Sequence, residues 1–276
     1  MLTPVCKIAI MKSVLRKKKE VTTLSKEEFS MAESKDYFQV IRQSLAHART
    51  SQRENILAAA RMMGDCMINK GVVQLFGLGH GIAFSMELGF RAGGLVPFHQ
   101  LRIQDLLLRG KVTPEEANAE GYVDRPDLAQ KIYDMYIMDE RDMFILISNG
   151  ANEGVGVEFA KMVKEKGQKV ILVTSRACSE HSVSHHPSGK KITDYADLII
   201  DNGAMDPDTV IELEDGTKIN QTATIVGNFL AQMICAETYR YITAKGLDCP
   251  VLLSANVKGA DVHNNSYTDQ YNGRVR

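Results

Sequence analysis

A glycine-rich turn separates an apolar run from a helical pattern in residues 72–91, VVQLFGLGHGIAFSMELGFR. His80 lies in this turn between Gly79 and Gly81, and Glu87 lies on the helix that follows. Glycines let the backbone approach a ligand closely, and the first amides of a helix point outward without partners. The segment therefore predicts an anion-binding turn with an imidazole at its mouth and a carboxylate nearby.

Glu87 has two interpretations that the sequence leaves open. A partly buried carboxylate acts as a base when it lies within hydrogen-bond reach of the C–H group that loses its proton. Alternatively, Glu87 forms a structural ion pair with Arg91, because residues four apart share one helix face. His80 likewise either contacts a ligand or only bonds the backbone.

A second group of histidines, His181, His185 and His186, follows a later apolar run. No acid or cysteine spacing typical of a zinc site accompanies them, so we expect a substrate-covering loop from which one histidine reaches the ligand. The turn GLGHG lacks the third glycine of a dinucleotide site. We therefore predict no metal and no cofactor.

Composition excludes several function classes. Residues 1–30 carry seven Lys/Arg and three Glu, a net charge of +4, which leaves −5 for the rest of the chain. A mildly acidic body argues against nucleic acid as a partner, and no apolar run reaches the ~18 residues that span a bilayer. The five cysteines are odd in number and form no CxxC pair, so reduced thiols and a cytoplasmic location are expected. We expect residues 1–30 to be a basic, disordered extension and residues 31–276 to form a single domain.

Short apolar runs alternate with helical patterns along that domain. We expect strands over residues 72–76, 95–98, 143–147, 170–173 and 198–200, and helices over residues 34–70, 82–92, 127–138, 155–166 and 222–243. A hairpin is expected over residues 210–219, around Asp215 and Gly216. Continuously apolar strands that alternate with helices are typical of an α/β fold, a doubly wound parallel sheet covered by helices on both faces.

Small polar residues follow the predicted strands, where a doubly wound sheet binds its ligands. They are Ser148, Asn149 and Asn152 after residues 143–147, Thr174 and Ser175 after residues 170–173, and Thr222 and Thr224 at the start of the last long helix. Hydroxyls and backbone amides at helix N-termini suit a phosphate without a lysine. A phosphate site at this edge of the sheet is therefore expected.

Taken together, these segments resemble the sugar isomerase (SIS) domain family of phosphosugar-binding α/β sandwiches over about residues 35–272. The segments are GLGHG, ELGFRAGGLVP, SNGAN, HHPSGKK, ADLIIDNGA and SANVKGADVHNNS. Each motif alone is weak, but their order and spacing are typical of the family. The nearest resemblance is to stand-alone bacterial members similar to phosphoheptose isomerase, and it implies a flavodoxin-like, three-layer fold.

The resemblance implies a phosphorylated sugar as ligand and an aldose–ketose isomerisation through an enediol. Glu87 would move the proton between C1 and C2, while His80 or His186 would assist at the sugar ring. The phosphate would lie against Gly79 and the strand-end residues named above. Members are commonly oligomers, so we expect a homodimer or homotetramer, in which His263 either reaches a neighbouring subunit's site or is a surface histidine.

Two departures from the family pattern keep other functions open. Residues 148–152 lack one hydroxyl of the family's usual turn, and Glu153 places an acid where it would repel a phosphate. A non-catalytic phosphosugar sensor is therefore one alternative, although the chain lacks the basic helix-turn-helix of the DNA-binding members. A phosphosugar lyase or etherase is the other, because elimination beside a carbonyl would use the same base.

Overall fold

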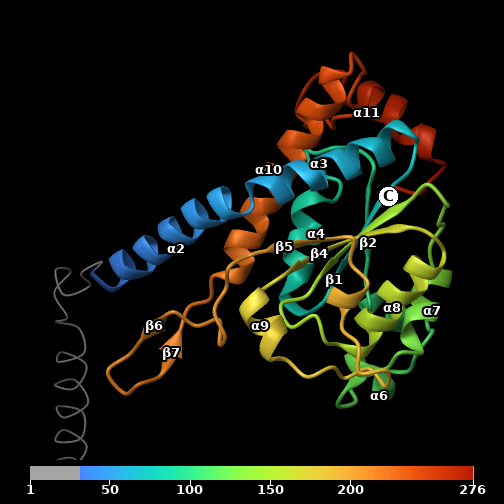
Figure 1. The fold of residues 1–276 in the computed structure, drawn as a ribbon. Coiled ribbons are helices and arrows are strands. Elements are labelled where there is room, and N and C mark those ends of the chain that lie inside the picture. Colours follow the sequence, from blue (N-terminus) through green and yellow to red (C-terminus); the bar gives the residue numbers. More distant parts are fainter. Residues whose placement is uncertain (1–31, 276) are drawn as a thin grey trace, which may run out of the picture. The chain divides into compact units, whose positions relative to one another are not determined.

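The computed structural model describes residues 32–275, with side chains from Tyr37 onward (Figure 1). The disordered extension expected over residues 1–30 lies outside the described residues. The chain divides into two compact units, residues 1–40 and 41–276. Helix α2 (Ala32–Ser51) crosses that boundary, and every strand and later helix belongs to the second unit. The single domain expected over residues 31–276 stays a prediction.

Five parallel strands form the central sheet of the second unit. They are β1 (Val73–Gly77), β2 (Phe98–Leu101), β3 (Met143–Ile147), β4 (Lys169–Thr174) and β5 (Leu198–Asp201). Their order is β2-β1-β3-β4-β5, with Leu75 opposite Ile145 and Ile145 opposite Ile171. β1 and β3 are buried along their whole length, as continuously apolar strands are when helices cover both faces. The doubly wound α/β fold predicted from the sequence is confirmed.

Helices cover both faces of this sheet (Figure 1). Those on one face are α3 (Arg53–Ile68), α4 (Ile82–Leu88) and α10 (Ala223–Ala244), and those on the other are α5 (Gln104–Leu108), α7 (Leu128–Asp134) and α8 (Gly154–Glu165). Successive strand residues point to opposite faces, so Val73 and Leu75 join the first core while Phe76 joins the second. The apolar strands thus contribute side chains to two separate hydrophobic cores, one on each face of the sheet.

The remaining elements are short. They are α6 (Pro114–Ala117), α9 (Arg176–His181), α11 (Ala260–Thr268), the 3-10 helices η1 (Gly79–Gly81), η2 (Tyr122–Asp124), η3 (Ile192–Asp194) and η4 (Asp269–Tyr271), and the strands β6 (Ile211–Glu212) and β7 (Lys218–Ile219). β6 and β7 pair antiparallel, so the predicted hairpin is confirmed. Among the described helices, none is both long and apolar enough to cross a membrane.

Three predicted helices are divided or shorter than expected. The helix expected over residues 127–138 is observed as α7 and ends at Asp134. The helix expected over residues 34–70 is divided at Gln52, between α2 and α3. The helix expected over residues 82–92 ends at Leu88, because Gly89 takes extended backbone angles of φ −76° and ψ 120°. A Cβ at Gly89 would lie 2.3 Å from Gln100 Nε2, so the backbone here passes close to the Gln100 side chain of β2.

The strand expected over residues 95–98 lies further along the chain, at β2. β2 contains the half-buried polar residues His99 and Gln100, so a search for apolar runs places this edge strand too early. Leu95 instead forms an isolated bridge with Val251. The sequence also fails to predict α9 and α11, because both helices are mostly polar.

A buried ion pair fastens the C-terminal segment to the start of β3. The side chains of Asp142 and Arg274 are 0% and 7% exposed, and Arg274 Nη2 donates to Asp142 Oδ1. The same carboxylate accepts from the Val72 amide at 2.8 Å and from Gln74 Nε2 at 3.0 Å. A buried charge persists only when it is paired and hydrogen-bonded, so each of the two residues depends on the other.

Arg274→Met should lower the free energy of unfolding by roughly 3–5 kcal/mol, because it leaves the Asp142 charge buried without its partner. Arg240→Met is the control: Arg240 is 67% exposed and pairs with Glu237 on the surface. The control should cost less than about 1 kcal/mol. Urea denaturation followed by circular dichroism measures both losses, and equal losses would show that Asp142 does not rely on Arg274.

Candidate functional site

The turn after β1 lies directly against the end of β3. A Cβ at Gly77 would lie 2.5 Å from the Gly81 backbone, and a Cβ at Gly81 would lie 2.6 Å from the Ile147 carbonyl oxygen. Gly79 has a φ of +53°, in the left-handed region. Glycine is therefore required at these positions, and the tight turn brings His80 to the point where the strand order reverses, between β1 and β3.

A small crevice opens at this point, at the carboxyl ends of the strands. Its lining residues are His80, Gly81, Phe84, Ile147, Asn149, Asn202, Ala223, Thr224 and Asn228. Its volume is about 30 Å³, which admits a hydroxyl group or a water molecule, so a larger ligand would extend over its rim. His80 is the one titratable side chain in this set, and the other polar groups are amides and a hydroxyl.

The amides in the crevice are held by defined hydrogen bonds, with one exception. Asn202 Nδ2 donates to Asn149 Oδ1 at 2.8 Å, and Thr174 Oγ1 donates to the Asn149 carbonyl at 2.9 Å. By contrast, Asn228 Oδ1 is buried and has no hydrogen-bond partner among the described residues. Leaving a buried acceptor unpaired costs roughly 1–3 kcal/mol, so this atom suits a donor supplied by a ligand.

Two of the predicted phosphate-binding residues are bonded to internal carboxylates. Ser148 Oγ donates to Glu153 Oε2 at 2.6 Å, directly before α8. The Thr222 hydroxyl and amide donate to Asp208 Oδ1 at 2.8 and 2.9 Å, and the Ala223 amide donates to Asp208 Oδ2 at 3.0 Å. A phosphate at the N-terminus of α8 or α10 would therefore compete with a carboxylate of the chain itself.

The remaining predicted phosphate-binding residues divide between the crevice and the surrounding loops. Asn149 and Thr224 line the crevice, and Gly79 lies in the adjoining turn. Ser175 donates to the Ala204 carbonyl at 2.7 Å and accepts from the Cys178 amide, capping α9. The role in phosphate binding of each of these residues, and of Ser148, Asn152, Thr174 and Thr222, stays a prediction.

Glu87 lies outside the residues that line the crevice. Its carboxylate forms an ion pair with Arg91, as the structural interpretation requires, and accepts from Gln232 Nε2 of α10 at 2.6 Å. The Glu87 side chain is 25% exposed, so it is partly buried. The contacts of the structural interpretation are present, and the catalytic role stays a prediction.

The later histidines are bonded within the fold. His186 is buried, with Nε2 at 2.8 Å from Glu158 Oε2 and Nδ1 at 2.7 Å from Ser188 Oγ. His263 Nε2 lies 3.0 Å from the Val251 carbonyl. His181 and His185 lie beside Asp206 and Asp124 respectively. In the part of the chain that the structure describes, no three His, Cys, Asp or Glu side chains gather as a metal site would require.

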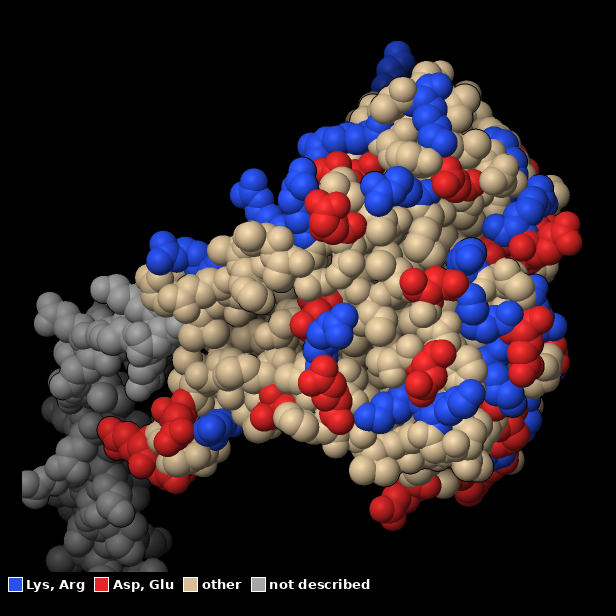
Figure 2. Space-filling view, viewed as in Figure 1, with Lys and Arg blue, Asp and Glu red and all other residues tan. Residues whose placement is uncertain are grey.

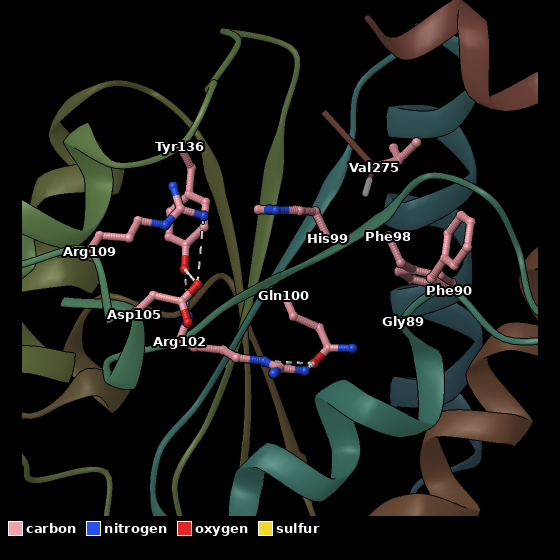
Figure 3. A pocket seen from close by; sticks show the side chains of 10 residues that line it. All are labelled: Gly89, Phe90, Phe98, His99, Gln100, Arg102, Asp105, Arg109, Tyr136 and Val275. Carbon is pink, nitrogen blue, oxygen red and sulfur yellow. Dashed lines mark hydrogen bonds and ion pairs between the residues drawn. The ribbon is translucent and has the colours of Figure 1, made fainter. Parts of the chain in front are cut away.

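A further hollow, which is not predicted from the sequence, lies beside the edge strand β2 (Figure 3). This β2 groove has a volume of about 330 Å³ and is lined by Gly89, Phe90, Phe98, His99, Gln100, Arg102, Asp105, Arg109, Tyr136 and Val275. His99 Nδ1 lies 2.8 Å from Gln74 Oε1 of the neighbouring strand. Burial, together with the nearby Arg109, lowers the pKa of His99 to about 4, so its ring is neutral at pH 7. The available signal was Gln74, a polar residue within an apolar strand.

Comparison with known families identifies the fold. The SIS domain model matches residues 36–175, about half of the chain. The protein belongs to the SIS domain family. The resemblance inferred from its motifs is thereby confirmed.

Relatives of this SIS domain protein occur in several bacteria. A UPF0309 protein of Geobacillus kaustophilus is 31% identical over 241 residues, which cover 87% of this chain and 94% of that protein. A UPF0309 protein of Listeria monocytogenes is 31% identical over 243 residues, covering 87% and 96%. The similarity thus extends over nearly the whole length of these relatives.

Two solved structures share the fold. A structure described as a phosphosugar isomerase involved in capsule formation, from Bacteroides fragilis, has a TM-score of 0.51 at 15% identity and covers 77% of this chain and 91% of that one. A phosphoheptose isomerase from Francisella tularensis also has a TM-score of 0.51, at 14% identity, and covers 76% and 98%. At these identities the SIS domain protein shares their three-layer architecture.

Proposed function

We propose that this SIS domain protein binds a phosphorylated sugar over the crevice between β1 and β3. The observation that carries the proposal is the unpartnered Oδ1 of Asn228, buried at the place where a doubly wound sheet binds its ligands. One sugar hydroxyl enters the crevice and donates to this oxygen. Family membership and the sugar-phosphate names of the two proteins that share the fold support the same ligand class.

The polar groups around the crevice fit a sugar better than a charged group. Asn149 and Asn202 supply amides, Thr224 supplies a hydroxyl, and no Asp, Glu, Lys or Arg lines the crevice. Amides and hydroxyls donate and accept at once, as sugar hydroxyls require. The body of the sugar lies over the rim, because the crevice itself admits only a small group.

The phosphate lies at the rim, against His80 and Thr224. Thr224 is in the first turn of α10 and supplies a hydroxyl donor at the rim of the crevice. Asp208 and Glu153 already occupy the first amides of α10 and the turn before α8, which keeps the phosphate away from those two positions. His80 then supplies an imidazole donor beside the Thr224 hydroxyl.

The face drawn in Figure 2 carries Lys and Arg interspersed with Asp and Glu. A nucleic-acid site would gather basic side chains in a stripe. A small anionic ligand needs no such stripe, so the mixed surface agrees with a phosphosugar as the partner. A homodimer or homotetramer and a cytoplasmic location stay predictions from the sequence.

Asn228→Ala should weaken binding of the preferred sugar phosphate by about tenfold, since about 1.4 kcal/mol of hydrogen bonding is lost. The melting temperature of the free protein should not fall, because the substitution also removes an unpartnered buried oxygen. Isothermal titration calorimetry with pentose, hexose, hexosamine and heptulose phosphates measures the affinity. Asn118→Ala, at the exposed end of α6, is the matched control. Equal affinities in the two variants would contradict the site.

Aldose–ketose isomerisation through an enediol is the reaction that we propose for the bound sugar. The favouring observation is the position of the partly buried Glu87 carboxylate on α4, the helix that leads out of the glycine turn. His80 donates to the ring oxygen during opening, and Glu87 transfers the proton between C1 and C2. Since Glu87 does not line the crevice, its carboxylate must move from Arg91 or act from a second copy of the chain.

Deuterium should enter C1 or C2 of the preferred sugar phosphate when the wild-type protein is incubated with it in D2O. Glu87→Gln should slow this exchange by roughly 10²–10⁴-fold, the contribution typical of a general base, with the affinity nearly unchanged. Proton NMR follows the exchange. Glu237→Gln is the control, because Glu237 is a half-buried carboxylate on α10 that is also paired with an arginine, Arg240. Tight binding by the wild-type protein without any exchange would make the protein a phosphosugar sensor.

A further inference from the structure

We propose that the β2 groove is a second ligand site, separate from the crevice, for a small anion that also carries a hydroxyl group. The groove lies along the edge of the sheet, and its residues come from β2, α5, the end of α4 and the segment after α7 (Figure 3). Its volume of about 330 Å³ is within the range of small-molecule pockets. This inference does not depend on the proposed function.

A chain of buried groups fixes the proton on His99. Gln74 Nε2 donates to Asp142 Oδ2 at 3.0 Å, so Gln74 Oε1 faces His99 and accepts from its Nδ1–H at 2.8 Å. Asp142 is in turn held by its ion pair with Arg274. The ring therefore carries its proton on Nδ1, and Nε2 keeps a lone pair.

That lone pair needs a donor from outside the protein. The structure gives His99 Nε2 no hydrogen-bond partner among the described residues, and the ring extends from β2 toward Tyr136 and Arg109 (Figure 3). The pKa of His99, lowered to about 4, keeps Nε2 an acceptor at neutral pH. A ligand hydroxyl is the group that this acceptor suits.

Two arginines line the groove, and one of them is available to bind an anion. Arg109 lies 3.7 Å from Asp105 Oδ2, so this pair is nearly neutral. Arg102 donates to the neutral Gln100 Oε1, at 2.6 Å from Nη2, and forms no ion pair within the described residues. One guanidinium is thus left to bind a carboxylate or phosphate, the anions that its planar donors match.

The groove walls are held in place before any ligand binds. The Tyr136 hydroxyl donates to Asp105 Oδ2 at 2.8 Å and accepts from the Arg102 amide at 3.1 Å. Arg109 donates to the Met135 carbonyl and lies over the Tyr136 ring. At the opposite end Phe90 has a φ of +44° and is 52% exposed, a strained conformation for a bulky residue of the kind that clusters at ligand sites. The groove is therefore rigid and polar at one end and apolar at the other.

Calorimetry on the full chain at pH 7.5 tests the site with four probes: glycerol 3-phosphate, glycerate, inorganic phosphate and glycerol. We expect glycerol 3-phosphate or glycerate to bind at least tenfold more tightly than inorganic phosphate or glycerol, because only these two carry both the anion and the hydroxyl. The tighter of the two identifies the anion as phosphate or carboxylate. Binding of neither, or equal binding of all four, would overturn the proposal.

Two variants and one spectrum locate the binding. Arg102→Met should weaken the bound probe at least tenfold, whereas Arg240→Met, on the exposed surface of α10, should leave it unchanged. His99→Phe should remove the advantage of the hydroxyl-bearing probe over inorganic phosphate. Long-range ¹H–¹⁵N NMR of the wild-type protein should show His99 with its proton on Nδ1 and a shift at Nε2 when the probe is added. A proton on Nε2, or retained affinity in Arg102→Met, would refute the site even if His99→Phe fails to fold.

Discussion

The close approach of the β1 turn to β3 is the constraint on which the crevice depends. Side chains at Gly77 or Gly81 would meet backbone atoms within 2.6 Å, so the turn can close only with glycine. Closure brings His80 beside the residues that follow β3 and β5, and α10 then covers the remaining side. Backbone packing, and not a charged cluster, therefore makes the opening in which a sugar hydroxyl is proposed to bind.

The crevice and the β2 groove differ in their electrostatics for a structural reason. Near the crevice, the carboxylates of Glu153 and Asp208 accept hydrogen bonds from hydroxyls and helix amides. The side chains that line the crevice itself are mostly uncharged. Beside β2, the buried pair of Asp142 and Arg274 lies at the end of a hydrogen-bonded chain that leads to His99. An uncharged opening suits hydroxyls, whereas the β2 groove combines a neutral acceptor with an available guanidinium.

The sequence predicts the strands that are apolar along their whole length and the polar residues at their carboxyl ends. β1 and β3 are found within one residue, and Asn149 is found at the crevice, because strand-end position needs no tertiary information. Thr224, also at the crevice, follows from the predicted start of the last long helix. Asn228 lies in the second turn of α10, where only the packing of that helix reveals an unpartnered oxygen. The hydrogen bond between Thr222 and Asp208 joins residues that are 14 positions apart, so no local sequence pattern predicts it. The β2 groove is not predicted, because it lies beside an edge strand that contains both apolar and polar residues.

The central claim is that a phosphorylated sugar binds over the crevice between β1 and β3. The most direct measurement is a titration of protein labelled with ¹⁵N in its asparagine side chains, using the sugar phosphate that calorimetry selects. The account predicts that the side-chain amide signals of Asn149, Asn202 and Asn228 shift together with one dissociation constant, while that of Asn118 on α6 stays in place. Saturable binding that leaves the three crevice signals unmoved would contradict the account.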